Sequence, residues 1–441
     1  MPDLFPFLSE YDPATTSEGS LDPLGLYPVA DRLAVHLIPG FRERMGHPRF
    51  LTAMAVGSVI CSGFDDDIVA SDGVSEPWQV FEWYVVQALT RRFYKEPDEI
   101  RGLPGREKAT AAYKLGMPLN ATRYLKTASV FGFNGVYRTL ARELNLLDVH
   151  DNLGEFGHEL IQVWEKEQKL EGFYSTSTGP GRQFRNILYK AVKEGLEKGE
   201  VARKWGWGFF NNIAEYLAPY RMGKKEIDTI FHALINESAP KRGEVIQFLM
   251  SEKVQKIWKA EQSEKILHEE LYNHASEELK ELLLAIQHYE MFSRILQNAF
   301  ESILYYLSNI SRGNINNLAE LEQVQRASKE IDRAYELALT HLEPFDESSG
   351  FILSFGNIAN SGDSRDWVSL LFEHHKTNQR RKPPAGKKPW YERIPENSFM
   401  IYSKYKLQKE PKYTDDYVNS YRTNSLMSFL SDLKMISNGS E

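Results

Sequence analysis

The 441-residue chain contains one cysteine, Cys61. A single thiol excludes an internal disulfide, and it excludes a zinc or iron–sulfur site built from cysteines of this chain alone. Cys61 lies in an apolar helical run, so we expect it to be buried and inert as a nucleophile. So little cysteine is typical of a protein that works in a reducing compartment.

The chain also lacks long apolar runs and targeting segments. Its longest apolar segments, such as Phe50 to Cys61, are much shorter than the roughly 20 residues that cross a bilayer. The first residues, MPDLFPFLSEYDPATTSEG, are acidic and broken by proline, unlike a secretory or organelle-targeting leader. We therefore expect a cytoplasmic protein that does not enter a membrane.

Catalytic motifs are missing too. There is no Gly-x-Ser-x-Gly elbow and no glycine-rich loop ending in Gly-Lys-Ser/Thr. A metal-dependent hydrolase would need clustered aspartates to meet a distant histidine, and the candidates are Asp65, Asp66, Asp67 and Asp72 with His36 or His47. An acidic linker that caps the next helix explains these aspartates equally well. The sequence favours a protein that is not an enzyme, with no cofactor and no metal.

What the chain does contain indicates a folded, mainly α protein of several domains. Hydrophobic residues make up 42% of it, and apolar positions recur at helical spacing from Leu26 to Leu37, after His47-Pro48 and after Pro77. Changes in composition predict an N-terminal arm and helical subdomain, a basic module, a helical middle domain, a long helical hairpin and a C-terminal region with a basic proline-rich loop. Their ranges are 1–100, 101–172, 173–263, 264–345 and 346–441.

The hairpin is predicted from two long amphipathic patterns. One runs from Glu264 to about residue 310, as one helix or two abutting ones, and the other runs from Leu318 to Leu342. The short SRGNINN segment between them favours an antiparallel pair. As an assembly scaffold, this hairpin would pack against itself or a protein partner through an exposed apolar stripe, formed by Leu282, Ile286, Phe292, Ile295, Phe300 and Leu304.

Positive charge is concentrated in two stretches. Residues 101–145 carry eight basic and two acidic side chains, net +6, and residues 376–412 carry eleven basic and three acidic ones, net +8. The whole chain is at −8, so the remainder sums to −8 − 6 − 8 = −22. A polyanion is the partner that such segregation favours.

The first basic stretch leads into a pattern that resembles the end of a winged-helix module. Asn134 is a suitable N-cap for a helix through Leu144, and LLDVHDNLGEFGHELIQVW then reads as a short strand, a turn, a return and a helix. This is similar to the run that closes many bacterial winged-helix domains. The resemblance implies base contacts by Arg138, Thr139 and Arg142, and backbone contacts by Arg123, Lys126 and Thr127.

Other interpretations of this module stay open. A helix face that carries Arg138, Thr139 and Arg142 is also typical of a solvated surface in an ordinary helical domain. Wings also serve as dimer and protein contacts. Short helices are expected at about residues 106–115 and 120–126. The cluster around Asp151 and Asn152 is expected to form the turn of the wing.

The second basic stretch interleaves cations with aromatic rings, which suits phosphate tracking and base stacking. The candidate residues are Arg380, Arg381, Lys382, Lys387, Lys388 and Trp390. The same composition is typical of a solvated connection, of a contact for an acidic partner, or of a loop that docks on its own acidic protein.

In its texture the chain resembles helical accessory proteins of bacterial antiphage-defence and mobile-element operons, with a winged-helix-like part and a basic tail. The resemblance implies a non-catalytic subunit that binds nucleic acid, DNA rather than RNA, or one that scaffolds a partner ATPase or nuclease. The binding hypothesis predicts that the two basic stretches share one face.

Overall fold

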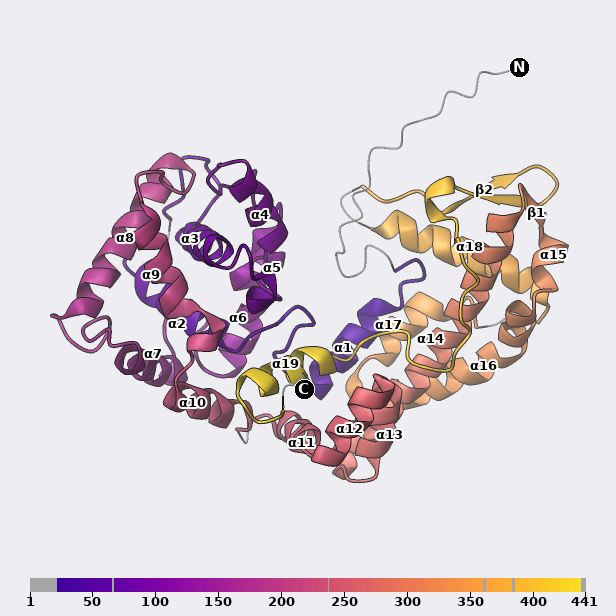
Figure 1. Cartoon of the computed structure of the whole chain (residues 1–441). Helices are drawn as coiled ribbons and strands as arrows, with labels where there is room; N and C mark the ends of the chain where they lie inside the picture. Colours follow the sequence, from indigo (N-terminus) through magenta and orange to yellow (C-terminus); the bar gives the residue numbers. More distant parts are fainter. Residues whose placement is uncertain (1–21, 66, 237, 360–361, 383–384, 438–441) are drawn as a thin grey trace, which may run out of the picture. The chain divides into compact units, whose positions relative to one another are not determined.

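The computed structural model describes residues 22–65, 67–236, 238–359, 362–382 and 385–437. Helices account for 62% of these residues and strands for 3%, so the predicted mainly α class is confirmed (Figure 1). The chain divides into two compact units, each built from separated pieces of sequence. Unit 1 comprises Met1–His36 and Ser263–Tyr421, and unit 2 comprises Leu37–Gln262 and Arg422–Glu441. Nearly all of the predicted N-terminal arm, 1–23, lies outside the described residues.

The regular elements of unit 2 are all helices in its described part, joined by turns and loops. Its elements are α2 (Arg49–Cys61), α3 (Pro77–Arg92), η1 (Pro97–Ile100), α4 (Arg106–Lys114), α5 (Ala128–Phe131), α6 (Phe133–Glu143), α7 (Glu155–Glu167), α8 (Pro180–Lys198), α9 (Trp207–Leu217), η2 (Pro219–Arg221), α10 (Lys224–Leu234), α11 (Pro240–Leu249), α12 (Glu252–Glu261) and α19 (Thr423–Asp432).

Helix α2 forms the centre of unit 2. It carries no charge after Arg49, and all 13 of its residues are buried. A helix that is apolar on every side is stable only when neighbours surround it, and α2 contacts α3, α6, α7, α8 and α9. The buried helix predicted after His47-Pro48 is confirmed, as is the helix that begins at Pro77 and ends in Arg91 and Arg92.

An ion pair is buried between α2 and α10. Arg49 and Glu226 are both 0% exposed, and their charged groups pair directly. Thr52 donates its hydroxyl to the same carboxylate, and Arg49 also donates to the carbonyl of Tyr216 at 2.5 Å. Loss of one member of such a pair costs about 3–5 kcal/mol because the other charge stays buried. The pair therefore fixes α10 against the central helix.

Helix α6 is capped from another helix. The carboxylate of Glu82, on α3, accepts the backbone N–H groups of Phe133 at 2.6 Å and Asn134 at 3.1 Å. The N-cap position itself is Gly132, where a Cβ would lie only 2.5 Å from Glu82 Oε1. The prediction that Asn134 caps this helix is wrong, because a buried carboxylate already occupies the positive end of the helix dipole.

The inward face of α6 is apolar. Val136, Leu140 and Leu144 are 4%, 0% and 7% exposed. Tyr137 is 0% exposed as well. Its hydroxyl accepts the N–H of Gly46 at 3.0 Å, and this polar contact allows the ring to be buried.

Residues 120–126 do not form the short helix that their pattern predicts. Asn120 Oδ1 accepts the backbone N–H of Arg123 at 2.9 Å and the hydroxyl of Thr122 at 3.0 Å. A side chain that bonds nearby amides in this way competes with the helix and closes a turn. The next helix, α5, begins at Ala128.

Between α6 and α7 the chain makes a tight antiparallel turn. Leu147 and Leu153 form one isolated bridge, and α7 begins at Glu155. The order of helix, paired turn and helix follows the predicted one, whereas the pairing is a single bridge rather than two strands. We refer to residues 147–153 as the α6–α7 turn.

Unit 1 combines helices with a small sheet. Its elements are α1 (Tyr27–Leu37, at the unit boundary), α13 (Glu264–Tyr272), α14 (Glu277–Asn309), β1 (Gly313–Asn314), α15 (Ile315–Ala319), α16 (Glu322–Leu342), η3 (Glu343–Phe345), α17 (Ser348–Phe355), α18 (Ser364–Arg381), β2 (Tyr391–Ile394), β3 (Ser398–Ile401) and η4 (Ser403–Tyr405). The strands are antiparallel in the order β1-β3-β2.

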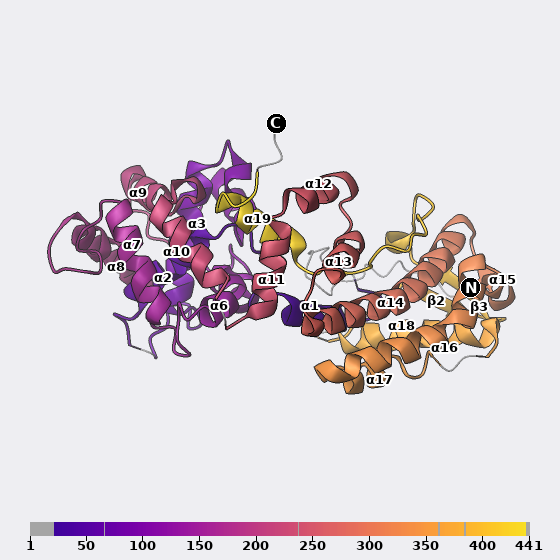
Figure 2. The same cartoon turned by 90° about the horizontal axis from the view of Figure 1, so that it is seen from below.

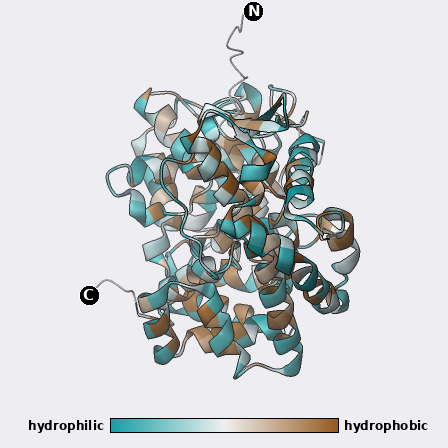
Figure 3. Ribbon diagram, turned by 90° about the vertical axis from the view of Figure 1, so that its right-hand side faces the viewer, coloured by the Kyte–Doolittle hydropathy of each residue, from teal (hydrophilic) through white to brown (hydrophobic). Residues whose placement is uncertain are grey.

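Helices α14 and α16 lie side by side along much of their length (Figure 2). Apolar and polar residues mix along most helices, as expected when each helix buries one face (Figure 3). The stripe expected to be exposed on α14 is buried, with Leu282, Ile286, Phe292, Ile295, Phe300 and Leu304 between 0% and 9% exposed. That prediction is wrong because α16 packs along α14 and rings of α17 and α18 also contact the stripe. Phe292 contacts Phe351 at 5.0 Å, and Phe300 contacts His375 at 4.9 Å between ring centroids.

In the part of the chain that the structure describes, no helix combines the length and the apolar character needed to cross a membrane.

Candidate nucleic-acid interface

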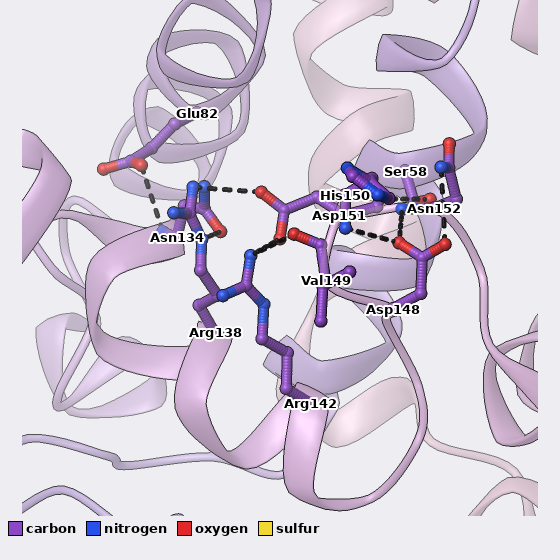
Figure 4. Close-up of polar contacts among 10 residues, drawn as sticks. All are labelled: Ser58, Glu82, Asn134, Arg138, Arg142, Asp148, Val149, His150, Asp151 and Asn152. Carbon is purple, nitrogen blue, oxygen red and sulfur yellow. Dashed lines mark hydrogen bonds and ion pairs between the residues drawn. The ribbon is translucent and has the colours of Figure 1, made fainter.

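Two arginines of α6, predicted to face bases, converge on one carboxylate. Arg138 lies 3.1 Å and Arg142 2.8 Å from the oxygens of Asp151. Figure 4 shows both side chains reaching from α6 to the α6–α7 turn. Arg142 also donates to the carbonyl of Val149 at 3.0 Å. The pair of cations is therefore partly neutralised, and it ties the turn to the helix.

The α6–α7 turn is fixed by its own acidic residues. Asp151 has a φ of 61°, and its carbonyl accepts the hydroxyl of Ser58 at 2.9 Å. Asp148 accepts the N–H groups of His150 at 2.8 Å and Asn152 at 2.9 Å (Figure 4). Val149 is 75% exposed at the tip. The turn thus presents a rigid tip rather than a mobile basic loop.

Beneath α6 lies the ionisable group that caps it. Burial raises the pKa of Glu82 to about 7, while hydrogen bonds from Tyr124, Phe133 and Asn134 and the charge of Arg138 act in the opposite direction. The charge under α6 therefore changes near neutral pH.

The residues predicted to contact the nucleic-acid backbone differ in their surroundings. Arg123 pairs with Glu200 at 2.7 Å and donates to the carbonyl of Pro118 at 2.7 Å. Lys126 and Thr127 are exposed just before α5. Thr139 is half-buried on α6. The structure brings Arg138 and Arg142 together but places Arg123 in a separate ion pair.

The second set of candidates lies in unit 1, at the end of α18 and beyond it. Arg380 and Arg381 are exposed in the last turn of the helix. Lys382 donates through Nζ to the carbonyl of Asp22 at 2.7 Å, the backbone N–H of Lys387 donates to Gln379 at 2.8 Å, and Lys388 is exposed. Pro383 and Pro384, part of the predicted loop, lie outside the described residues.

Trp390 already belongs to a column of rings. It stacks on Tyr405 with centroids 4.5 Å apart and an interplanar angle of 9°. Phe300 and His375 lie near it at 6.0 Å and 5.5 Å, and Lys404 lies over Tyr405 at 4.6 Å. A base would have to enter this column to stack on Trp390. In this structure the ring therefore packs within the fold.

After β3 the chain runs back along α14 as an extended segment, residues 406–421, which we name the strap. Ser308 accepts the N–H of Leu407 at 2.9 Å, and Asn298 donates to the carbonyl of Thr414 at 3.3 Å. Arg294 donates to the carbonyls of Asp416 and Tyr417, at 2.6 Å each. Glu290 accepts the N–H of Val418 at 2.5 Å. These four helical residues occupy one face of α14 and hold the strap in place.

Several cations outside the predicted contact residues are exposed in this region. Arg393, Lys404, Lys406, Lys409 and Lys412 are exposed, and none of them has a carboxylate within ion-pair distance among the described residues. The same holds for Arg380 and Arg381. The net charge of 376–412 was the available signal, but it did not distinguish paired from unpaired cations. These seven residues, Arg380, Arg381, Arg393, Lys404, Lys406, Lys409 and Lys412, are named the cationic arm.

Two candidate residues of the alternative hydrolase hypothesis, His47 and Asp72, have other partners. His47 Nδ1 lies 2.5 Å from Asp432, and Asp72 accepts the hydroxyl of Ser75 at 2.7 Å. Among the described residues, which exclude Asp66, no three carboxylate, imidazole or thiol side chains come together to hold a metal. Burial, together with the charge of Asp151, raises the pKa of the Cys61 thiol well above its ordinary value.

The fold and these surfaces define a mainly helical protein of two units, with a cationic arm on unit 1 and a basic module in unit 2 whose α6 arginines are paired. No known protein family matches the chain, and neither do any curated proteins or solved structures.

Proposed function

We propose that this chain is a non-catalytic nucleic-acid-binding protein and that the cationic arm makes the main contact with phosphates. The observation that carries the proposal is the exposure of these seven cations without a carboxylate partner among the described residues. Binding of phosphates by such side chains releases the counterions condensed on the nucleic acid. Lysines and arginines already paired within a fold contribute much less of this free energy.

The acidic remainder of the chain supports a confined interface. Residues outside the two basic stretches sum to −22, so they repel a polyanion and limit its contact to the basic surfaces. The first basic stretch belongs to unit 2 and the second to unit 1, so each forms a separate basic surface.

In this proposal the winged-helix-like module provides a second, conditional contact. Lys126 and Thr127 are exposed and available to a phosphate backbone. Arg138 and Arg142 would reach bases only after leaving Asp151, which they hold at about 3 Å. Duplex DNA is the form that a winged helix binds, so DNA is favoured over RNA for this contact.

The resemblance to accessory proteins of antiphage-defence operons supplies the proposed setting. There, the chain would deliver nucleic acid to a partner ATPase or nuclease that carries the chemistry. The scaffold alternative loses its main support because the apolar stripe of α14 is buried.

Fluorescence anisotropy of the full chain with duplex DNA, single-stranded DNA and RNA, at rising salt, tests the proposal. The double variant Arg380→Gln/Arg381→Gln should weaken binding and reduce its dependence on salt. A matched control is Lys256→Gln/Lys259→Gln, which removes the same charge from exposed positions of α12. Absence of binding even at low salt, or equal loss in the control, would overturn the proposal.

A further inference from the structure

A cavity of about 330 Å³ lies inside the basic region of unit 1, between α18 and the β2–β3 pair. Its aromatic lining comes from Phe372, Tyr391, Phe399 and Tyr402. Phe372 stacks on Phe399 with centroids 4.2 Å apart, and the hydroxyl of Tyr391 donates to the carbonyl of Phe372 at 2.7 Å. Three of these rings are at most 4% exposed, so they form a fixed floor.

The cavity differs in charge from the region around it. Its ionic lining consists of two cations, Lys376 and Arg393, and two carboxylates, Glu373 and Glu392, which sum to zero. Residues 376–412 as a whole are at +8. Lys376 pairs with Glu373 at 2.8 Å, so that part of the wall is neutral by itself. An uncharged, flat group suits the cavity, while phosphates suit the other six residues of the cationic arm, none of which lines it.

Polar atoms at the cavity wall can read the edge of such a group. Arg393 donates to Asn397 Oδ1 at 2.6 Å, which leaves the amide nitrogen of Asn397 and the carboxylate of Glu392 to face a ligand. Small-molecule sites in proteins combine mostly apolar walls with a few oriented polar groups of this kind. Nucleobases present both a π-face for stacking and an edge with donors and acceptors.

We propose that this cavity accepts one unpaired nucleobase of a single strand whose phosphates lie on the cationic arm. This inference rests on the proposed function, and it names the form of nucleic acid that unit 1 prefers. A duplex would first have to unstack and unpair a base, and this step costs free energy. In a single strand the base is already unpaired, so binding does not include that cost. Unit 1 should therefore bind single strands more tightly than duplexes of the same sequence.

The experiment fills the cavity without changing any charge. Ser369 is an exposed residue of α18 that lines the cavity, and among the described residues its hydroxyl bonds only to the carbonyl of Arg365, at 3.3 Å. In the full chain, Ser369→Phe should weaken binding of a labelled single-stranded oligonucleotide by roughly tenfold, the contribution of about one stacked base. Binding of the matching duplex should stay unchanged.

A control variant and a second cavity variant complete the test. Ser349→Phe adds the same ring at an exposed position of α17, outside the cavity, and should leave both affinities unchanged. Tyr402→Leu removes a ring from the wall and should reproduce the loss for the single strand. Unchanged single-strand binding in Ser369→Phe, or equal loss for single strand and duplex, would overturn the cavity assignment alone. Failure of the unaltered chain to bind any nucleic acid would instead overturn the proposed function.

Discussion

The buried carboxylate of Glu82 shows how one side chain can organise distant sequence. It joins α3 to the start of α6 and also accepts the hydroxyl of Tyr124. Glu167 does the same at α10, accepting the N–H groups of Lys225 at 2.9 Å and Glu226 at 3.1 Å. Two helices of unit 2, α6 and α10, are therefore capped by carboxylates from neighbouring helices, which local capping rules do not predict.

The first prediction concerns the pH dependence of stability through Glu82. Its pKa is raised from 4.5 in the unfolded chain to about 7 in the folded one. Its contribution to stability is therefore fully present below the unfolded-state pKa and is lost as pH rises through the folded-state pKa. A shift of this size corresponds to about 3 kcal/mol. Glu82→Gln should remove this alkaline loss in urea unfolding. Glu82→Ala should cost about 3 kcal/mol at acidic pH because α6 loses its acceptor, and less above pH 7, where the unaltered chain has already lost the pH-dependent part of this stability. An equal pH slope in Glu82→Gln and the unaltered chain would contradict the assignment.

A second prediction has the opposite sign and concerns His268 of α13. Burial lowers its pKa from 6.5 to about 4, and its ring lies 5.5 Å from Tyr417 and 5.7 Å from Tyr421. The stability it contributes is present above the unfolded pKa and is lost as pH falls through the folded one, about 3 kcal/mol in all. Burial lowers the pKa of His375 to about 4 as well. His268→Phe should therefore reduce the loss of unfolding free energy between neutral and acidic pH, measured by urea unfolding at both. If the variant loses as much stability in acid as the unaltered chain, the prediction is wrong.

At the scale of elements, the α6–α7 turn depends on Asp151. Asp151→Asn removes the carboxylate shared by Arg138 and Arg142 and should reduce stability by about 1 kcal/mol, the usual value for partly exposed pairs. It should also strengthen duplex binding several-fold if the module contributes, since two arginines become available. Asp148→Asn is the control, because it removes the same charge from the same turn without an arginine contact. Equal effects of the two variants on binding would rule out a role for the α6 arginines.

The strap provides another prediction at this scale. Glu290 is 1% exposed, and its carboxylate accepts the backbone N–H groups of Val418 and Asn419 in the strap. The same carboxylate accepts the hydroxyl of Tyr421 at 2.7 Å. Glu290→Ala should increase amide hydrogen exchange at Val418 and Asn419 by well over tenfold, because each loses its acceptor. Glu281→Ala, at an exposed position of the same helix, should leave this exchange unchanged. Protection that persists in Glu290→Ala would mean that the other anchors suffice.

At the scale of the whole molecule, the segregation of charge predicts a specific salt dependence. Each phosphate contact contributes about 0.9 to the slope of log K against log salt for duplex DNA. Removing two cations of the arm with Lys406→Gln/Lys409→Gln should therefore lower the slope by about 2. The double variant Arg138→Ala/Arg142→Ala, whose side chains are already paired, should lower it less. A larger decrease in the second variant would move the main contact to unit 2.

The helical class and many helix positions are determined by the sequence alone, because apolar spacing, N-terminal prolines and terminal arginines act within one helix. Helices α2 and α3 follow these local rules. Charge segregation is equally a property of composition. None of these features requires knowledge of what a residue contacts across the chain.

The tertiary structure alone decided which of these groups have partners. The apolar stripe of α14 is buried because α16 packs along this helix and rings of α17 and α18 contact it, the cap of α6 comes from Glu82, and Arg138 and Arg142 meet Asp151. The cavity beside α18 likewise depends on residues from a helix and two strands. Contacts between positions far apart in sequence carry no local periodicity, so a pattern of charge predicts the kind of partner, whereas only packing determines which cations remain available to bind it.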